Sequence, residues 1–135
     1  MVEVHLNHMA VLVSAAVHFL LGGLWYSPVL FAKPWMRVVG LSEEDMKKGA
    51  SPMPYAIAFA ASLFSAYALG CVLSAVQATS VWDGLSIGLM TGVGFVLPAG
   101  MHYAFESRPL KLYVINFGYS VAGLGIMGVI LTMWK

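Results

Sequence analysis

Residues 49–82 read GASPMPYAIAFAASLFSAYALGCVLSAVQATSVW and contain no Asp, Glu, Lys or Arg. An α-helix rises about 1.5 Å per residue, so about 20 apolar residues cross a hydrocarbon core about 30 Å thick. The stretch is long enough to cross such a core, with residues left over for a turn. It decides the fold class, because an uncharged apolar run of this length predicts a transmembrane helix.

Three further runs have the same character. Apart from tyrosines, His18 is the only ionisable side chain in residues 9–32, His102 is the only one in residues 84–105, and residues 112–134 have none. With the first run, they predict four transmembrane helices near residues 8–27, 54–78, 84–105 and 111–134. We therefore expect a single all-α domain over residues 1–135, an integral membrane four-helix transmembrane bundle.

The composition excludes a soluble globular domain. Hydrophobic residues make up 60% of the 135-residue chain and charged residues 10%, against about 45–50% and about 25% in soluble domains. A net charge of +1 argues against a nucleic-acid partner, which would need a basic stripe. The single cysteine, Cys71, lies in an apolar stretch and excludes an intrachain disulfide.

The basic residues lie mostly on one side of the predicted helices. Six of the seven fall in the loops after the first and third helices, and only Lys135 falls on the other side. Basic residues near the ends of spans stay in the cytoplasm, so both loops should be cytoplasmic and both termini outside. The six are Lys33, Arg37, Lys47, Lys48, Arg108 and Lys111.

The loop after the first helix has two parts. Residues 42–49, SEEDMKKG, begin with an N-cap serine and three acidic residues and end with two lysines and a glycine, which predicts a short cytoplasmic helix. Residues 30–39, LFAKPWMRVV, mix aromatic and cationic side chains, which is typical of a segment in the cytoplasmic headgroup layer. A solvated hairpin is the alternative for this second segment.

Small residues recur at every fourth position in the second and third predicted helices and at spacings of four and three in the last, and such spacing lets helices approach closely in lipid. Pro98 should bend the third helix before Gly100. Two interpretations of these small-residue seams are open: all serve packing within the chain, or some serve a homo-oligomer. The seams are Ala58, Ser62, Ala66, Gly70, Ser74 and Ala78; Gly84, Gly88 and Gly92; and Gly118, Ala122, Gly125 and Gly128.

His18 lies near the middle of the first helix, where Ser14, His18 and Gly22 share one face. An ionisable group within a span is costly unless it faces the bundle interior or water. The functional interpretations are a proton relay, a metal or haem ligand, or a polar contact to a bound ligand. The alternative is a neutral histidine that bonds to a neighbouring hydroxyl or carbonyl group.

A second group of polar and aromatic residues falls at the cytoplasmic boundary, near one membrane depth. This arrangement predicts a ligand-binding cavity open to the cytoplasm. The residues are Trp25 and Tyr26 at the end of the first helix, His102 and Glu106 on one face of the third, and Asn116 inside the fourth. The alternative is a hydrogen-bond and ion-pair network of the last three with Arg108, which fixes the turn between the third and fourth helices.

Neither a metal, a cofactor nor an enzymatic activity is expected. Two axial haem ligands should lie at similar depth, but His18 lies about 12 Å inside the boundary and His102 only about one turn from it. His5 and His8 lie near each other at the outer end of the first helix without a third ligand. The sequence contains no phosphate-binding loop, nucleophile elbow or metalloprotease motif.

Two segments carry a family resemblance. Residues 22–40, GGLWYSPVLFAKPWMRVVG, and the final hairpin with INFGYS at 115–120 resemble the family described as domain of unknown function 1761. The resemblance implies a small bacterial-type, four-span protein of the cell inner membrane without an established activity. It directs attention to Gly23, Trp25, Tyr26, Ser27, Pro28, Trp35, Asn116, Gly118 and Tyr119, and Tyr119 thereby joins the candidate ligand-binding residues. Ala32, where glycine is expected, departs from the pattern.

These patterns favour a non-enzymatic membrane protein that self-associates or serves as an accessory subunit, with a cytoplasm-facing site for a lipid or small ligand. Its expected partners are membrane lipids and a homo-oligomer or larger membrane complex, with no nucleic acid. The main alternative is an oligomeric proton-coupled transporter of small solutes that uses His18, His102 and Glu106. A third hypothesis is an enzyme acting on a lipid, for which only the pair His102 and Glu106 qualifies.

Overall fold

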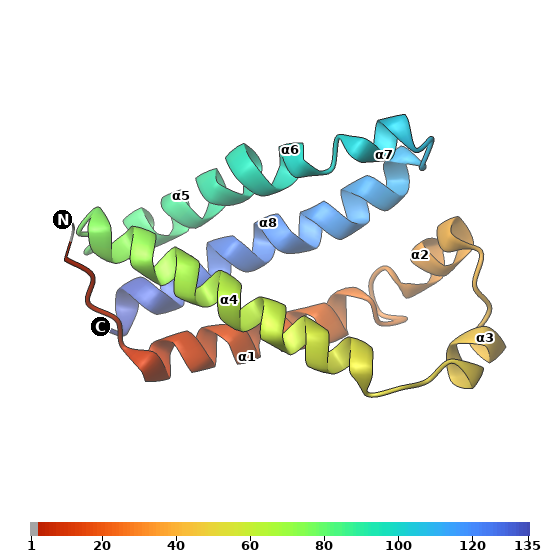
Figure 1. The fold of residues 1–135 in the computed structure, drawn as a ribbon, viewed down its shortest axis with the longest axis horizontal. Coiled ribbons are helices and arrows are strands. Elements are labelled where there is room, and N and C mark those ends of the chain that lie inside the picture. Colours follow the sequence, from red (N-terminus) through yellow and green to blue (C-terminus); the bar gives the residue numbers. More distant parts are fainter. Residues whose placement is uncertain (1–2) are drawn as a thin grey trace.

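The computed structural model describes residues 3–135, and this part of the chain is all-α. Four long helical segments lie side by side, and short helices fill the first loop (Figure 1). The long segments are α1 (His8–Trp25), α4 (Met53–Ala75), the run from α5 to α7 (Val81–Phe105) and α8 (Leu110–Met133). Each is long and apolar enough to span a membrane, so the fold class expected from the sequence is confirmed and the chain has the character of a multi-pass membrane protein.

The helix ends differ from the predicted spans by a few residues, for local reasons. α1 ends at Trp25 rather than near residue 27, because Tyr26 is already its C-cap. α4 ends at Ala75 rather than near residue 78, and Gln77 turns the chain with a φ of 55°. α5 begins at Val81 rather than residue 84, because Ser80 and Asp83 form a reciprocal capping box. The predicted start of the third span lies three residues too far along the chain, because Asp83 was taken as a charge that flanks the helix.

The bundle has two distinct ends, which we name by their residues. The terminal end holds the start of α1, the turn at 76–80 and the end of α8. The cation-rich end holds the loop from α1 to α4 and the turn from α7 to α8, which carry the six basic residues given above. Figure 1 shows both chain ends on the left and the loop helices on the right.

Two short helices form the loop at the cation-rich end. α2 (Ala32–Val39) ends at Gly40, whose φ of 76° suits glycine. α3 (Glu43–Lys48) confirms the helix predicted at 42–49. The Ser42 hydroxyl accepts from the Asp45 N–H at 3.1 Å, and the Asp45 carboxylate accepts from the Ser42 N–H at 3.0 Å. These hydrogen bonds hold the pKa of the Asp45 carboxyl below its usual value.

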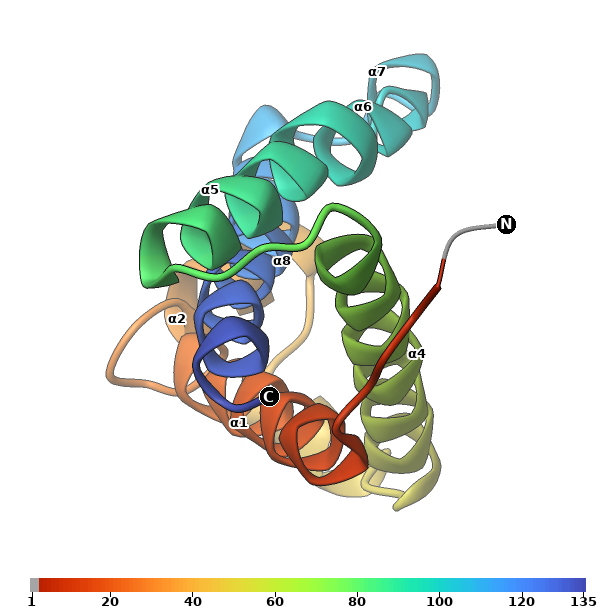
Figure 2. The same ribbon diagram turned by 90° about the vertical axis from the view of Figure 1, so that its left-hand side faces the viewer.

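α8 lies between the other long helices and contacts α5, α1 and α4, as the end-on view shows (Figure 2). Its contact with α5 is made by backbone. A Cβ atom at Gly84 would collide with the Gly128 carbonyl, and one at Gly88 would collide with the Leu124 carbonyl. The Thr132 hydroxyl, also buried here, donates to the Gly128 carbonyl at 2.8 Å. Only glycine lets two helices approach this closely.

The predicted seam of α4 also packs within the chain. Ser62, Ala66 and Gly70 are buried against α1 and α8, and Ala78 is buried after the helix ends. Ala58, the first member of the predicted seam, is exposed instead. The small residues therefore have partners inside one chain along most of the bundle.

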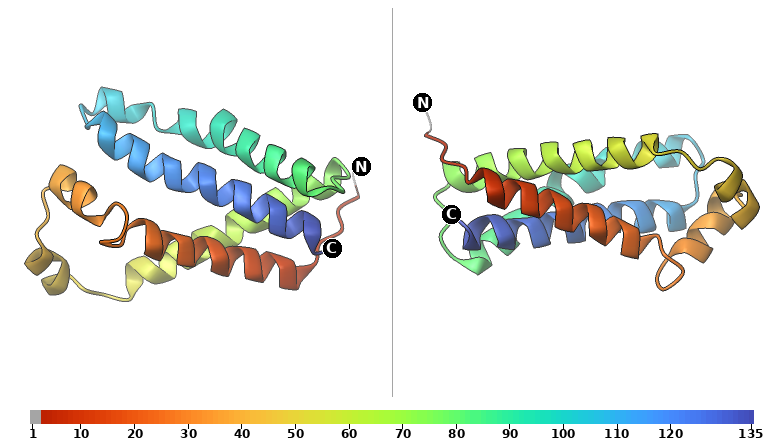
Figure 3. Two further views of the ribbon diagram at one scale, coloured as in Figure 1. Left: turned by 180° about the vertical axis from the view of Figure 1, so that it is seen from behind. Right: turned by 90° about the horizontal axis from the view of Figure 1, so that it is seen from below.

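The third span bends, as Pro98 predicts, but the irregularity begins earlier. The wide-turned segment η1 (Gly92–Val96) separates α5 (Val81–Thr91) from α6 (Leu97–Ala99), and α7 (His102–Phe105) follows after a break (Figure 3). Gly100 lies at this break and packs against the rings of Tyr113 and Phe117. Such turns are typical of bends inside helices. Because of the bend and the break, α7 does not continue along the axis of α5.

Candidate functional site

A chain of polar contacts joins α1, α7 and α8 near the cation-rich end. The Tyr26 hydroxyl donates to the Asn116 side-chain carbonyl at 2.8 Å, and the Asn116 amide donates to the Tyr103 hydroxyl at 3.2 Å. The Trp25 indole N–H donates to the Ile115 carbonyl at 2.9 Å. We call Trp25, Tyr26, Tyr103, Asn116 and Tyr119 the aromatic–amide cluster.

Aromatic rings fix the cluster to the loop helix α2. The Tyr26 ring meets the Tyr119 and Trp35 rings edge to face, each at 5.8 Å between centroids. Trp25 lies 4.9 Å from Phe31 and packs on Gly118, where a Cβ would come within 3.3 Å of the indole. The end of α1 and the middle of α8 therefore interlock.

His18 forms a second polar group deeper in the bundle. Its Nδ1 lies 2.9 Å from the Ser62 hydroxyl, which itself donates to the Ala58 carbonyl at 2.9 Å. The Tyr119 ring stacks on the imidazole at 4.6 Å and its hydroxyl donates to the His18 carbonyl at 2.8 Å. On its Nδ1 side, His18 is therefore the hydrogen-bonded histidine of the alternative interpretation.

The other side of this group is unpaired. The His18 Nε2 atom and the Ser14 hydroxyl are buried, and neither has a hydrogen-bond partner among residues 3–135. Nε2 lies against Gly123, where a Cβ would collide with the imidazole. A buried polar atom without a partner costs free energy unless water or a ligand reaches it.

His102 and Glu106 make no hydrogen bond to the aromatic–amide cluster, and His102 touches it only through its ring, which meets the Tyr103 ring edge to face at 5.0 Å between centroids. Both are exposed. The His102 Nδ1 lies 2.7 Å from the Ala99 carbonyl, and Glu106 forms an ion pair with Arg108 at 3.1 Å. Of the six candidate ligand-binding residues, the structure brings together four: Trp25, Tyr26, Asn116 and Tyr119. The alternative network forms in part, because Glu106 binds Arg108 while Asn116 binds tyrosines instead.

A small cavity adjoins the cluster at the cation-rich end. It has a volume of about 210 Å³ and lies between the α6–α7 break and the start of α8. The Arg108 guanidinium carbon lies 5.2 Å from the centroid of the Tyr103 ring. The sequence pattern predicted Arg108 only as part of an ion-pair network, and Tyr103 was not among the predicted site residues. The lining residues are Gly100, Met101, Tyr103, Ala104, Arg108, Leu110 and Tyr113.

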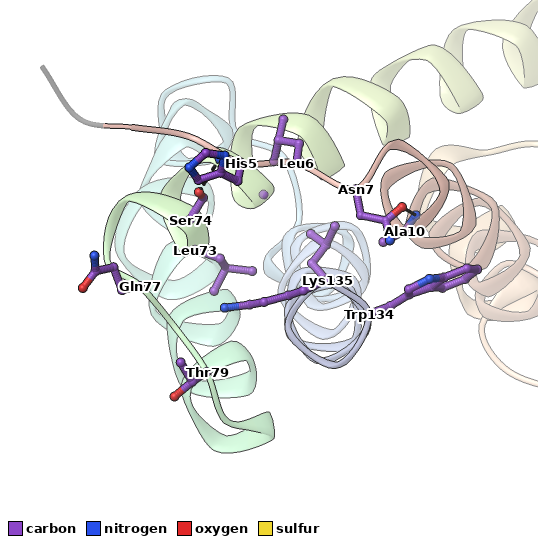
Figure 4. Close-up of a pocket in the computed structure, with 12 residues that line it drawn as sticks. His5, Leu6, Asn7, Ala10, Leu73, Ser74, Gln77, Thr79, Trp134 and Lys135 are labelled. Carbon is purple, nitrogen blue, oxygen red and sulfur yellow. Dashed lines mark hydrogen bonds between the residues drawn. The ribbon is translucent and has the colours of Figure 1, made fainter.

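A larger cavity of about 610 Å³ lies at the terminal end, where Figure 4 shows side chains from three helix ends. The sequence does not reveal this cavity, because its walls come from segments far apart in the chain. Within residues 3–135, no group of three His, Cys, Asp or Glu side chains is placed to hold a metal ion. The two outer histidines have other partners: the His5 imidazole lies 3.7 Å from Glu3, and the His8 Nδ1 lies 2.9 Å from the Tyr67 hydroxyl.

The comparisons with known proteins bear on the same residues. A family model described as protein of unknown function, DUF1761, matches residues 9–132. The chain belongs to the DUF1761 family. The match confirms the resemblance read from the sequence, and its range contains the whole aromatic–amide cluster and His18. No curated protein and no solved structure matches this DUF1761 chain.

Proposed function

We propose that this DUF1761 protein is a non-enzymatic integral membrane protein of the inner membrane that binds an anionic lipid at its cation-rich end. The observation that carries the proposal is the 210 Å³ cavity beside the aromatic–amide cluster, with Arg108 and Tyr103 in its lining. The polar atoms of Tyr26 and Asn116 already satisfy each other. Tyr26 and Asn116 therefore act as a scaffold, and the ligand contacts come from the cavity, which Tyr103 of the cluster also lines.

Arg108 has the chemistry to bind a phosphate group. A guanidinium has five N–H donors, and the structure gives Arg108 one acidic partner, Glu106. Its side chain is 52% exposed, so donors remain free toward the cavity and the headgroup layer. Arginine binds phosphate through paired hydrogen bonds. The six basic residues at this end also attract anionic lipid, and they favour a cytoplasmic orientation of this end.

The test is lipid retention measured by native mass spectrometry of the protein released from nanodiscs. The discs contain equal amounts of phosphatidylglycerol and phosphatidylcholine. We expect bound phosphatidylglycerol in the natural protein, and Arg108→Gln should lower its retention about tenfold relative to phosphatidylcholine, the effect of losing one charge-assisted bond. Lys111→Gln is the matched control, because Lys111 is exposed at the same end and does not line the cavity. Equal loss in both variants, or no loss in either, contradicts a specific site.

Self-association, or association with a larger complex, is part of the same proposal. Most small residues of the seams are used within the chain, but a Cβ at Gly23 or at Gly94 would meet nothing within 4 Å. These two positions leave backbone open to a second helix. Mass photometry of the protein in nanodiscs measures the copy number directly, and a monomer at all protein concentrations would reject homo-oligomerisation.

Proton-coupled transport is the second candidate function, favoured by the unpaired Ser14 hydroxyl and His18 Nε2 atom. Of the three titrating residues that the sequence suggested, this proposal keeps His18 alone, because His102 and Glu106 make their contacts at the surface. Proteoliposomes with an imposed pH gradient and an internal pH dye provide the test. His18→Ala should abolish protein-dependent proton flux and His102→Ala should leave it unchanged. Flux that is equal in the natural protein and in both variants rejects this function.

A further inference from the structure

The terminal-end cavity is large enough for a ligand. Its volume of about 610 Å³ lies within the range of about 300–1,000 Å³ that is typical of small-molecule sites. The start of α1, the end of α4 and the end of α8 surround it (Figure 4). It lies at the opposite end of the bundle from the proposed lipid site.

The lining of this cavity is amphipathic. One part is apolar, and it consists of Leu6, Ala10, Gly70, Leu73 and Leu131. The other part is polar, and it includes Asn7, Ser74, Gln77, Thr79 and Lys135. Such a division matches a ligand that has an apolar body and a polar head.

The residues before α1 form a wall of the cavity. The His5 backbone N–H donates to the Ser74 hydroxyl at 2.7 Å, which ties this segment to the last turns of α4. Leu6 lies over Gly70, where a Cβ would come within 2.9 Å of a Leu6 methyl carbon. The absence of a side chain at Gly70 therefore gives Leu6 its space. The segment before α1 closes the cavity on a third side, in addition to α4 and α8.

Lys135 supplies the positive charge. It is the one residue of the seven Lys and Arg that lies at the terminal end, and its side chain reaches from α8 toward the end of α4 in Figure 4. Its ammonium donates to the Ala78 carbonyl. An ammonium has three donors, so two remain for a ligand. The nearby Asp83 carboxylate is engaged by the N–H groups of Thr79 and Ser80.

We propose that the terminal-end cavity binds a single-chain amphiphile with an anionic head, either a free fatty acid or a lysophospholipid. The acyl chain lies along Leu6, Gly70 and Leu131, and the head contacts the Lys135 ammonium. Ser74 and Thr79 add hydroxyl groups at the same rim. A single cation favours a ligand with one negative charge, and Trp134 lies at the rim, where indoles favour the membrane interface.

Photo-crosslinking tests the proposal. The full chain in nanodiscs of phosphatidylcholine is irradiated with a palmitic acid that carries a diazirine near its methyl end, and labelled peptides are mapped by mass spectrometry. We expect labelling on peptides that contain Leu6, Gly70 or Leu131. Palmitate or lysophosphatidylglycerol should compete, and hexadecanol, which has the same chain without the charge, should compete about tenfold less well. The stronger of the two anionic competitors identifies the source of the head group.

Two variants distinguish the cavity from the general lipid surface. Lys135→Gln should weaken competition by palmitate about tenfold and leave competition by hexadecanol unchanged, since one charge-assisted bond is lost. Lys135 is exposed, so the variant should fold. Ser74→Phe should fill the cavity and should reduce labelling by the diazirine probe when no competitor is present. Equal competition by acid and alcohol, or labelling spread over lipid-facing residues in all three proteins, overturns the proposal. Neither outcome depends on Arg108 or on the lipid site at the other end.

Discussion

The two faces of α8 pack in opposite ways. Toward α5 it presents Gly128 and the Leu124 carbonyl, which meet the backbone at Gly84 and Gly88 directly. Toward α1 it presents Asn116, Tyr119 and Gly123, and the helices are joined by rings and hydrogen bonds. Backbone atoms of α5 and α8 meet directly on the glycine face, whereas α1 carries two buried polar atoms that have no hydrogen-bond partner among residues 3–135. The two faces therefore differ in what limits a substitution: backbone on the glycine face and side chains on the α1 face.

The largest expected effect is on the glycine face. Gly88→Ala places a methyl group against the Leu124 carbonyl and 3.0 Å from the Gly125 Cα, and backbone cannot move aside as a side chain can. We expect a loss of about 3 kcal/mol in the free energy of unfolding, measured by denaturant titration in detergent micelles. Gly23→Ala is the matched control, because its methyl meets nothing within 4 Å, and it should stabilise α1 by up to about 1 kcal/mol. If both variants unfold alike, backbone contact with α8 does not limit position 88.

On the α1 face the same change should cost less. Gly123→Ala places a methyl group against the His18 imidazole, a side chain that can rotate. We expect a loss of about 2 kcal/mol. Repeating the change in a His18→Ala background should remove most of that cost, because the obstructing ring is gone. A cost that persists in the double variant would show that backbone, and not His18, limits this face.

A smaller effect is expected from one hydrogen bond of the cluster. Tyr26→Phe keeps the ring contacts with Tyr119 and Trp35 and removes the bond to Asn116. We expect a loss of about 1 kcal/mol. In a double-mutant cycle with Asn116→Ala, the loss in the double variant should be smaller than the sum of the losses in the two single variants. Simple additivity would mean that the 2.8 Å contact contributes nothing.

The smallest effect lies outside both faces, in the exposed helix α3. The capping hydrogen bonds lower the pKa of the Asp45 carboxyl in the folded state. The support that they give α3 is therefore present above the unfolded pKa and is lost as pH falls through the folded one. Hydrogen exchange of residues 43–48 should accelerate as Asp45 becomes protonated, and exchange in α8 should not change. Ser42→Ala should give fast exchange in α3 at neutral pH as well.

The sequence predicted the positions of the helices better than the directions in which their side chains point around the helix axes. Charge-free runs and small-residue spacing were enough for the four spans and for the contacts of Gly84, Gly88 and Gly128. His102 and Glu106 were grouped with Asn116 by depth, but depth does not say which way a side chain points around its helix. The break after Ala99 lies between them and the regular part of the span. The His18–Ser62 bond was equally out of reach, because its partner lies on another helix 44 residues away.

The glycine side of the third span stays toward α8 through the bend. Gly84, Gly88 and Gly92 face α8 at intervals of four, and Gly100 faces it again eight residues after Gly92. The same eight residues separate Gly84 from Gly92, so the wide turn, Pro98 and the break before α7 leave this interval unchanged. A line of glycines therefore follows α8 along the whole span although the span is not straight, and Gly100→Ala should disturb the packing at its far end, because the new methyl group would collide with the Tyr113 ring.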